Sequence, residues 1–351
     1  MNTEIHNTRI DAVYAGVPEH QVLTADYSLF SPEEARLFTK NTGIHSRSVA
    51  PDGVTCSDLC YIAAEALLND FDVAHEIDLL IFVSQSPDYF LPATAILLQE
   101  RLGLSDACMA FDISLGCSGY VYGLQVVGQF IQSGAVRKAL LLVGDKSTIS
   151  TAYQDKSTYP LFGDAGTATL LSFSADSNPW FVNAGSDGSG KNSIIIEGGH
   201  SRNPYGTYSD ELFDYTGNMH SKSHLHLEGL DVFNFALHRV PQSIQETLNA
   251  AKKSISDVDY LVLHQANRFI LSTLAKKTGF TEAQTPMSVV EHFGNQSSAS
   301  IPCALIHGLA DRLEAGPLKI AGCGFGVGLS WGAFSGEIGP LTIAPILSLP
   351  R

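Results

Sequence analysis

Short runs of consecutive apolar residues alternate along the chain with longer stretches whose apolar residues recur on one side. The apolar runs span 78–83, 138–143, 167–173 and 260–263. Such runs are typical of strands that are buried on both faces of a sheet. The one-sided stretches predict helices over 57–68, 93–102, 119–133, 233–252 and 268–278. This alternation predicts an α/β fold with covered sheets.

The two halves of the chain share a plan. Each has a long helical region, an apolar strand and a Gly-rich turn into another strand, with turns at 164–167 and 322–326. This pattern predicts an internal duplication, with one domain over 1–175 and the other over 176–351. The stretch 183–229 is rich in Gly, Ser, Asn and His, and we expect loops and a hairpin there that shape a site.

The composition fits a folded chain with a sizeable core. Of 351 residues, 44% are hydrophobic and 16% are charged, which gives no sign of disorder. The formal net charge of −15 repels nucleic acid and anionic membranes. The sequence has no run of five or more Lys and Arg that would form a basic patch. We therefore expect neither a nucleic-acid partner nor a membrane partner.

The apolar segments predict a cytoplasmic protein. Residues 1–12 are largely polar and lack the basic and apolar regions of a signal peptide. The run at 139–143 is too short to span a bilayer. In a reducing cytoplasm we expect free thiols at all six cysteines, Cys56, Cys60, Cys108, Cys117, Cys303 and Cys323.

No motif predicts a metal site. Cys56 and Cys60 form a C-x-x-x-C pair without a second pair, which argues against zinc. His220, His224 and His226 cluster in a predicted loop, and their spacing fits no helical ligand set.

Cys117 is the first candidate for chemistry. An apolar segment leads through Gly116-Cys117-Ser118-Gly119 into a predicted helix, so we expect Cys117 at a strand-to-helix turn. The unpaired N–H groups and the positive dipole end of a helix stabilise a thiolate there. The two glycines permit a sharp turn and the close approach of a substrate. A buried structural thiol is the alternative interpretation.

Three further motifs lie in the second half. His264 directly follows the run at 260–263, at the strand end where ligands gather in α/β sheets; a structural histidine is the alternative. Asn295 lies in a Gly-Asn turn before a helical pattern, where ordinary turn chemistry is the alternative. The Gly-rich stretch at 322–328 can aim backbone N–H groups at an oxyanion. It lacks the contexts of the phosphate-binding motifs.

Together, in this order and spacing, these motifs resemble the β-ketoacyl-acyl-carrier-protein synthase III branch of the thiolase-like condensing enzymes. The resemblance runs from residue 42 to 332. It rests on the Cys117 turn, Leu161-Phe162-Gly163-Asp164, His264-Gln265-Ala266-Asn267, Gly294-Asn295 and Phe325-Gly326-Val327-Gly328. The elongating enzymes of the superfamily use two histidines, so the pair of His and Asn indicates the initiating branch. The family implies a duplicated five-layer α-β-α-β-α fold and a homodimer.

The resemblance also implies a role for each residue. Cys117 attacks the primer thioester and holds the acyl group. His264 and Asn295 donate hydrogen bonds to the malonyl thioester oxygen as decarboxylation forms an enolate, and the Asn amide can act there only as a donor. The backbone N–H groups of Cys117 and Val327 form the oxyanion hole, with Val327 at a position where relatives carry glycine. Acyl-CoA or acyl carrier protein and malonyl carrier protein are substrates, and no cofactor is bound permanently.

The predicted binding positions depart from the family pattern in part. Leu37 and Asn41 stand where relatives have the Trp and Arg that grip the adenine of CoA. This predicts weak CoA binding and a primer that arrives on a carrier protein. The positions that match CoA or pantetheine contacts are Lys156, Gly229, Phe233 and Asn267.

Two predictions concern other protein chains. Leu91 matches the residue of the dimer mate that caps the acyl pocket, commonly Phe, and so predicts room for a primer longer than acetyl. Arg268, Lys276 and Lys277 form a cationic face that would dock an acidic acyl carrier protein. A further docking lysine of relatives is Asn234 here, and a merely solvated helix face is the alternative.

Three other functions stay open. The same site could transfer the acyl group from Cys117 to an alcohol or amine. The chain could be a non-catalytic subunit that shapes a partner's site, although such a subunit would be expected to lack Cys117. A hydrolase with a nucleophilic Cys is the fourth reading, but its acid partner and chain order are not evident.

Overall fold

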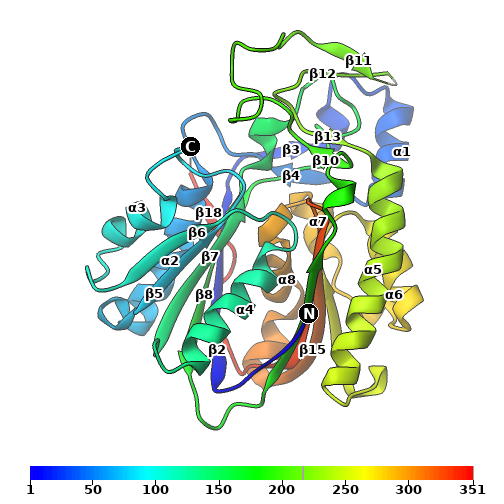
Figure 1. Ribbon diagram of the computed structural model, residues 1–351. Helices are drawn as coiled ribbons and strands as arrows, with labels where there is room; N and C mark the ends of the chain where they lie inside the picture. The colour runs from blue at the N-terminus through cyan, green and yellow to red at the C-terminus, as the bar shows by residue number, and fades with distance from the viewer. Residues whose placement is uncertain (216, 351) are drawn as a thin grey trace.

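The computed structural model describes residues 1–215 and 217–350. They form five layers, helix on sheet on helix on sheet on helix, which Figure 1 shows side by side from left to right. The predicted α/β architecture is therefore confirmed.

The first sheet has the strand order β17-β2-β8-β7-β5-β6, and β18 also pairs with β2. The strands β5, β6 and β7 run parallel, so their carboxyl ends meet at one edge. Their bounds are β2 (Thr8–Pro18), β5 (Leu79–Val83), β6 (Met109–Ile113), β7 (Lys138–Asp145), β8 (Ala165–Phe173), β17 (Thr342–Ile343) and β18 (Leu347–Leu349). The outer face of this sheet is covered by α2 (Cys56–Phe71) and α3 (Thr94–Arg101).

The second sheet has the order β1-β9-β16-β15-β14. Its strands are β1 (Asn2–Ile5), β9 (Trp180–Ser186), β14 (Tyr260–Leu263), β15 (Leu318–Gly326) and β16 (Ser330–Ile338). Its outer face is covered by α5 (Gly229–Ala250) and α6 (Arg268–Thr278). The short α7 (Ser288–Phe293) ends at Gly294, directly before Asn295.

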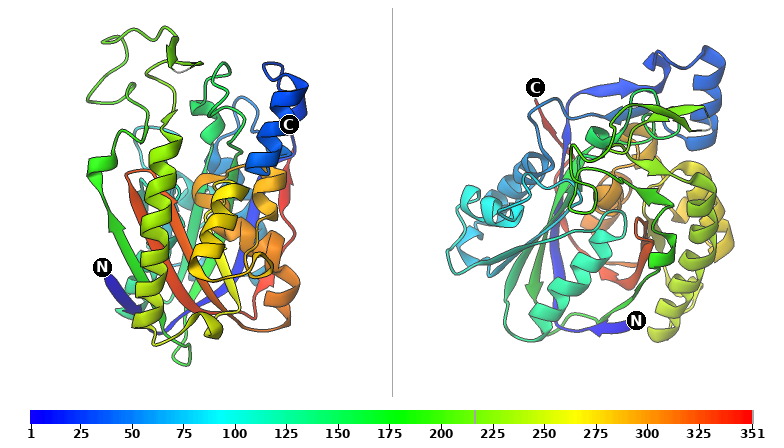
Figure 2. Two further views of the ribbon diagram at one scale, coloured as in Figure 1. Left: turned by 90° about the vertical axis from the view of Figure 1, so that its right-hand side faces the viewer. Right: turned by 45° about the horizontal axis from the view of Figure 1, so that its top comes forward.

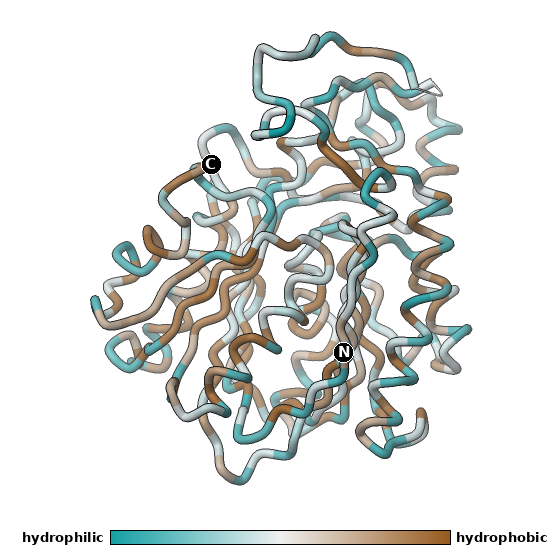
Figure 3. Tube along the Cα trace, viewed as in Figure 1, coloured by the Kyte–Doolittle hydropathy of each residue, from teal (hydrophilic) through white to brown (hydrophobic). Residues whose placement is uncertain are grey.

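The middle layer consists of α4 (Gly119–Gln132) and α8 (Ser300–Ala315). Both helices are apolar on most sides because sheets cover them from two directions, and α4 buries nine of its residues. The described residues form three hydrophobic clusters, one between the sheets and one under each outer helical layer. Figure 3 shows the same distribution, with apolar colour concentrated on the inner strands and helices.

The structure contains each strand and helix expected from the apolar pattern, with small shifts at the ends. The largest shift is in α5, which begins at Gly229 rather than at 233. The apolar run at 138–143 is part of the longer β7. Buried strands and amphipathic helices produce strong periodic signals, which is why their positions could be predicted.

The chain ends cross between the two sheets. The N-terminal β1 pairs with β9 in the second sheet, and the C-terminal β17 and β18 pair with β2 in the first. The segment around 175 lies between β8 and β9, which belong to different sheets. The domain boundary at 175/176 stays a prediction.

The expected excursion at 183–229 starts later than predicted, because residues 183–186 complete β9. The strands β1 and β16 pair with β9, one on each edge. Their hydrogen bonds stabilise a strand here in spite of the polar composition of the segment. The remainder forms two small antiparallel pairs, β10 (Ile194–Ile195) with β13 (His226–Leu227) and β11 (Phe213–Tyr215) with β12 (Asn218–His220). Figure 2 shows this segment at one end of the layered body.

The same end also carries α1 (Pro32–Thr42) and the pair β3 (Gln21–Leu23) with β4 (Ser46–Ser48). Among the helices that the structure describes, none has both the length and the apolar character needed to cross a bilayer.

Candidate active site

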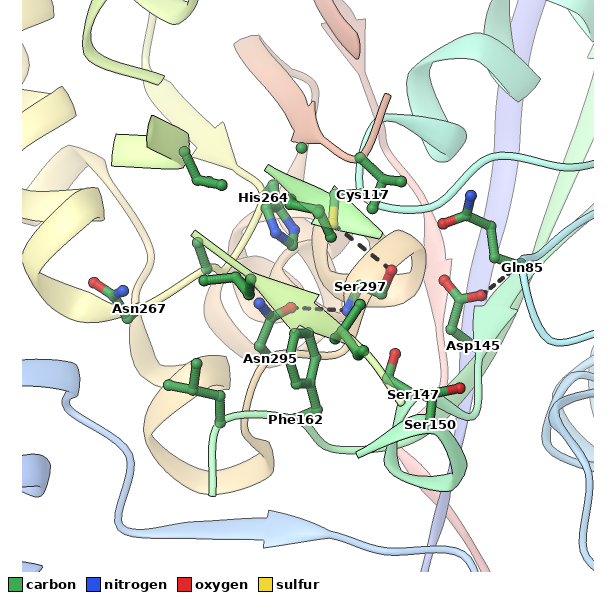
Figure 4. Close-up of a pocket in the computed structure, with 18 of the residues that line it drawn as sticks. Gln85, Cys117, Asp145, Ser147, Ser150, Phe162, His264, Asn267, Asn295 and Ser297 are labelled. Atoms are coloured by element: carbon green, nitrogen blue, oxygen red, sulfur yellow. Dashed lines mark hydrogen bonds between the residues drawn. The ribbon is translucent and has the colours of Figure 1, made fainter. Parts of the chain in front are cut away.

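A cavity of about 310 Å³ lies between the two sheets and receives residues from both halves of the chain. Cys117, His264 and Asn295 all line it, as do Val327 and Asn267. Figure 4 shows Cys117, His264 and Asn295 around the same space, although they come from loops that are far apart in the sequence. The structure thus brings the three candidates for chemistry together.

Cys117 lies in the turn between β6 and α4, as expected from the sequence. Its Sγ lies 3.7 Å from Ser297 Oγ. Burial raises the pKa of Cys117 to about 11, although the Ser297 hydroxyl and the Val327 N–H, which can donate to the thiolate form, act in the opposite direction. The expected thiolate at the helix N-terminus is therefore outweighed by desolvation, and the free protein holds a thiol at neutral pH.

His264 follows β14 directly and is almost fully buried. Its Nδ1 lies 2.7 Å from Ser300 Oγ, and the Gln265 N–H donates a hydrogen bond to the same Oγ at 3.2 Å. Burial lowers the pKa of His264 to about 4. The imidazole is therefore neutral near pH 7 and can either donate a hydrogen bond or take up a proton.

Asn295 is oriented by its own backbone surroundings. Its Oδ1 accepts a hydrogen bond from the Ser297 N–H at 2.9 Å, so its amide nitrogen is the group left for the cavity. The Asn295 N–H donates to Leu161 O at 2.9 Å, and Gly163 N donates to Asn295 O at 3.1 Å. The Leu161–Gly163 segment thus clamps the residue in place.

The clamp requires glycine at position 163. A Cβ atom there would lie 1.9 Å from Phe293 O, which is far inside contact distance. This explains the glycine in the Leu-Phe-Gly-Asp sequence.

The Gly-rich turn between β15 and β16 packs directly on Cys117. Gly326 has a φ of +156°, and a Cβ atom there would lie 2.9 Å from Cys117 Sγ. The next residue, Val327, lines the cavity and directs its N–H toward the sulfur. The geometry is compatible with the predicted oxyanion hole.

Sequence reasoning missed Ser297 at the centre of the site. It lies in a single helical turn, Ser297–Ala299, with a φ of +46°, which is rare for a residue other than glycine. Its hydroxyl contacts Cys117, its N–H holds Asn295, and its backbone interacts with His264. Strained backbone of this kind is frequent at functional sites.

Asp145 was also missed, although it ends a strand whose apolar part was predicted. It is 3% exposed and lines the cavity. It accepts hydrogen bonds from Ser84 Oγ (3.1 Å), Gln85 N (2.7 Å), Ser298 N (3.2 Å) and Ser298 Oγ (2.7 Å). Its position at the carboxyl end of β7 was the available signal.

The predicted pantetheine positions divide into two groups. Gly229 and Asn267 line the cavity, and Asn267 also caps α6 by accepting a hydrogen bond from the Ile270 N–H at 2.9 Å. Phe233 is outside the cavity lining and stacks on the exposed Phe269, with ring centroids 5.4 Å apart.

Lys156 and Leu91 lie outside the cavity lining as well. Lys156 pairs with Glu34 at 2.8 Å, at the start of α1. Leu91 is 82% exposed in a loop that also exposes Tyr89 and Phe90. A residue that caps a partner's pocket would be expected to have such exposure in its own chain.

The three cations of the predicted docking face on α6 differ in whether they form ion pairs. Arg268 pairs with Glu291 at 2.6 Å and approaches Glu282 at 3.8 Å, so neighbouring carboxylates offset its charge. Lys276 and Lys277 are exposed in the last turn, and within residues 1–215 and 217–350 they make no ion pair. These two lysines are therefore the free cations of this face.

The histidine cluster is apart from the cavity. His220 is buried near Asp155, and its ring lies against that of His226. In the part of the chain that the structure describes, no three His, Cys, Asp or Glu side chains are grouped to hold a metal ion.

The fold and site define a thiolase-like condensing enzyme, and comparisons with known proteins agree. The profile described as 3-oxoacyl-[acyl-carrier-protein (ACP)] synthase III matches residues 111–188, and the profile of its C-terminal part matches residues 248–338. A "3-oxoacyl-(Acyl-carrier protein) Synthase" crystal structure from Burkholderia xenovorans LB400 superposes with a TM-score of 0.94 at 38% identity, over 99% of both chains.

Curated relatives give the same assignment. A putative 3-oxoacyl-[acyl-carrier-protein] synthase 3 from Campylobacter jejuni is 32% identical over 95% of this chain and 94% of its own. A β-ketoacyl-[acyl-carrier-protein] synthase III from Lactococcus lactis is 33% identical over 92% and 97%. This protein belongs to the β-ketoacyl-acyl-carrier-protein synthase III family, which consists of acyltransferases.

Proposed function

We propose that this protein loads an acyl group from a thioester onto Cys117 and condenses it with a malonyl thioester on a carrier protein. The product is a β-ketoacyl carrier protein for fatty acid synthesis or a related lipid or polyketide pathway. The observation that carries the proposal is the convergence of Cys117, His264 and Asn295 on one cavity from three separate loops.

In the first half-reaction, a bond forms between Cys117 Sγ and the acyl carbon, and the carbon–sulfur bond of the donor breaks. The proton of the Cys117 thiol ends on the departing thiolate, so charge balances. Neutral His264 can carry the proton because it is unprotonated near pH 7. The Val327 N–H supports the oxyanion of the tetrahedral intermediate.

In the second half-reaction, the malonyl group loses CO₂ and becomes an enolate. The neutral His264 ring and the Asn295 amide both donate to its oxygen, and each donor of this kind stabilises the transition state by about 3 kcal/mol. The enolate carbon attacks the acyl carbon, and the bond to Cys117 Sγ breaks. The released thiolate then takes up one proton from solvent water, which balances the negative charge that the malonyl carboxylate brought in.

Intact-mass spectrometry tests the whole sequence. The protein is incubated with a panel of acyl-CoA and acyl carrier proteins, and malonyl carrier protein is added afterwards, with Cys117→Ala as the control. We expect an adduct on Cys117 that disappears as a carrier-bound chain two carbons longer appears. If none of the donors forms an adduct on Cys117, the proposal is overturned.

The same experiment separates the alternatives. An adduct that malonyl carrier protein cannot discharge, but that an alcohol or amine does, would indicate an acyltransferase to those acceptors. Absence of any adduct would favour a non-catalytic subunit. Cys117 lies in one cavity with the hydrogen-bond donors that condensation needs, His264 and Asn295, and this argues for the condensing function.

Carrier proteins are the proposed source of both substrates. Glu34 pairs with Lys156 and neutralises its charge. Leu37 and Asn41 lack the aromatic ring and the guanidinium group that would bind an adenine ring, so we expect CoA to bind weakly. The free cations Lys276 and Lys277 suit an acidic carrier. They lie about 15 Å along α6 from Asn267, which lines the cavity.

A homodimer and a cytoplasmic location belong to the same proposal. The strand β6 is at the edge of the first sheet with one side unpaired among the described strands, and Leu91 lies exposed in a nearby loop. Pairing of two β6 strands would cover this edge. Sedimentation of the wild type as a monomer would contradict the dimer. The free thiols of all six cysteines fit a reducing compartment.

A further inference from the structure

The Ser297 hydroxyl lies near two groups that can accept its proton in a hydrogen bond. On one side Cys117 Sγ is 3.7 Å from Ser297 Oγ. On the other is the buried Asp145 carboxylate, which accepts from the N–H (3.2 Å) and the Oγ (2.7 Å) of the adjacent Ser298, and the Ser297 hydroxyl counteracts the rise that burial causes in the pKa of Asp145. A hydroxyl has one proton to donate. It can therefore donate to Asp145 while accepting from the Cys117 thiol, or donate to the Cys117 sulfur, but not both.

Asp145 is held rigidly in its place. Its other partners, two backbone N–H groups and two serine hydroxyls, all donate to it at 2.7–3.2 Å. The charged or titratable groups that face the sulfur from the surrounding elements are Asp145 from β7, Lys146 beside it and His264 after β14. Lys146 Nζ already donates to the carbonyls of Pro51 (2.9 Å) and Val54 (2.7 Å), so it is not directed at the sulfur.

We propose that Ser297 is a hydrogen-bond switch for Cys117, whose proton turns from Asp145 to the sulfur when the thiol becomes a thiolate. At rest the hydroxyl accepts from Cys117 and keeps it as an inert thiol. During attack on the primer it donates to the sulfur and stabilises the nucleophile. This role rests on the proposed acyl loading of Cys117.

Alkylation of Cys117 by iodoacetamide tests the switch without any substrate, so its outcome is independent of the condensation assay. The rate at Cys117 is followed by peptide mass mapping of the full chain between about pH 6 and pH 10. Ser297→Ala removes the donor to the thiolate, and we expect alkylation near pH 8 to slow about tenfold, equivalent to one pKa unit. Asp145→Asn removes the competing charge, and we expect acceleration instead.

Two more variants separate the switch from damage to the loop. Ser297→Gly removes the same hydroxyl while fitting the φ of +46°, so it should slow alkylation as Ser297→Ala does without loss of thermal stability. Ser298→Ala removes a hydroxyl from the same carboxylate but not from the sulfur, and should change the rate by less than about twofold. Unchanged alkylation in Ser297→Ala, or slowing in Asp145→Asn, would overturn the proposal.

A different observation concerns the wall of the cavity. The side chains of Gln85, Ser147 and Ser150 line it, and none of the three makes a hydrogen bond to another described residue. On the excursion side, the lining side chains Ile194, Ile196, Leu225 and Leu227 are apolar. An acyl chain in this space would meet free polar groups on one side and apolar groups on the other.

From this wall we infer the substrate class: a primer whose acyl chain carries a hydroxyl or another hydrogen-bonding oxygen. A site with free hydrogen-bonding groups discriminates against an analogue that leaves them unpaired. This inference also rests on the proposed loading of Cys117.

A matched pair of donors tests it. Loading of Cys117 from butyryl and 3-hydroxybutyryl thioesters on the same carrier is compared by intact mass. We expect the hydroxylated donor to load about tenfold faster, which corresponds to one hydrogen bond, and the double variant Ser147→Ala/Ser150→Ala to lose the preference. Ser157→Ala is the control, because Ser157 lines the cavity but already donates to Asp155.

Equal loading of the two donors by the wild type would refute the substrate class. A preference that survives in the double variant would refute recognition of the hydroxyl by Ser147 and Ser150. Because both donors would still form adducts, such a result would leave the proposed condensation intact. Failure of both to load would instead bear on the proposed function itself.

Discussion

At Asn295, the difference between an amide and a carboxylate decides what faces the enolate. In Asn295→Asp, one carboxylate oxygen can still accept from the Ser297 N–H, so the fold should be kept. The other oxygen would face the cavity and repel the enolate instead of donating to it. We expect discharge by malonyl carrier protein to fall by about 10²–10³-fold, while loading of Cys117 continues.

Single-turnover intact-mass measurements would separate these two steps. Equal losses in loading and discharge would indicate that Asn295 has a general structural role rather than a donor role.

Burial of His264 links the site to stability at low pH. Its pKa in the folded protein is about 4, below the ordinary value of 6.5, so between these values the unfolded chain binds a proton that the folded chain does not. Its contribution to stability is therefore complete above about pH 6.5 and is lost as the pH falls through about 4. The shift corresponds to about 3 kcal/mol.

Urea unfolding at a series of pH values would measure this effect. In His264→Gln, we expect the free energy of unfolding to fall less steeply between about pH 6.5 and pH 4 than in the wild type. Parallel slopes for the two proteins would contradict it.

The sequence proposed Cys117, His264 and Asn295 through the joint order and spacing of their motifs, which resemble a known family, because each motif alone also allowed a structural interpretation. It was not sufficient for Ser297, which lies in a run of small polar residues with no distinctive spacing. The direction of the Cys117 pKa shift was also beyond the sequence, because it depends on how completely the folded chain removes water from the sulfur.

At the scale of elements, the contact between the 161–163 segment and the Asn295 turn can be tested through one methyl group. In Gly163→Ala, the new Cβ would overlap Phe293 O at 1.9 Å, so one of the two backbones must move. We expect a loss of about 3 kcal/mol or more in unfolding free energy and slower discharge of the acyl enzyme.

Gly188→Ala is the matched control, because no heavy atom lies within 4 Å of a Cβ at that position. It should change the unfolding free energy by less than about 0.5 kcal/mol. Similar urea midpoints for the two variants would show that the backbone of the 161–163 segment can shift at little cost and does not hold Asn295 in place.

Element prediction succeeded where one physical signal dominated. The buried strands β5, β7 and β14 and the helices α2, α4 and α6 have continuous or one-sided apolar patterns. It failed at β9, whose Asn, Gly and Ser residues gave no strand signal, because the pairing with β1 and β16 that stabilises it comes from distant parts of the chain.

At the scale of the whole molecule, docking must overcome a net charge of −15. For Lys276→Glu/Lys277→Glu we expect the KM for malonyl carrier protein to rise about tenfold, with kcat unchanged, because steering and docking are lost but not the chemistry. The difference from the wild type should shrink at high salt.

Lys319→Glu provides a control with a change of the same sign. It lies at the beginning of β15, at the opposite end from the Gly-rich turn beside Cys117. An equal rise in KM in this variant would indicate a general effect of net charge rather than docking at α6.

The crossing of the chain ends has a consequence for the integrity of the molecule. A cut in the 174–179 segment would give one fragment that carries β1, an edge strand of the second sheet, and another that carries β17 and β18, which complete the first. Each fragment would thus contain an edge strand whose pairing partner lies in the other fragment. Cys117 would also be divided from His264 and Asn295. We expect the two pieces, when coexpressed, to assemble into a tight split enzyme, and either piece alone to aggregate without activity.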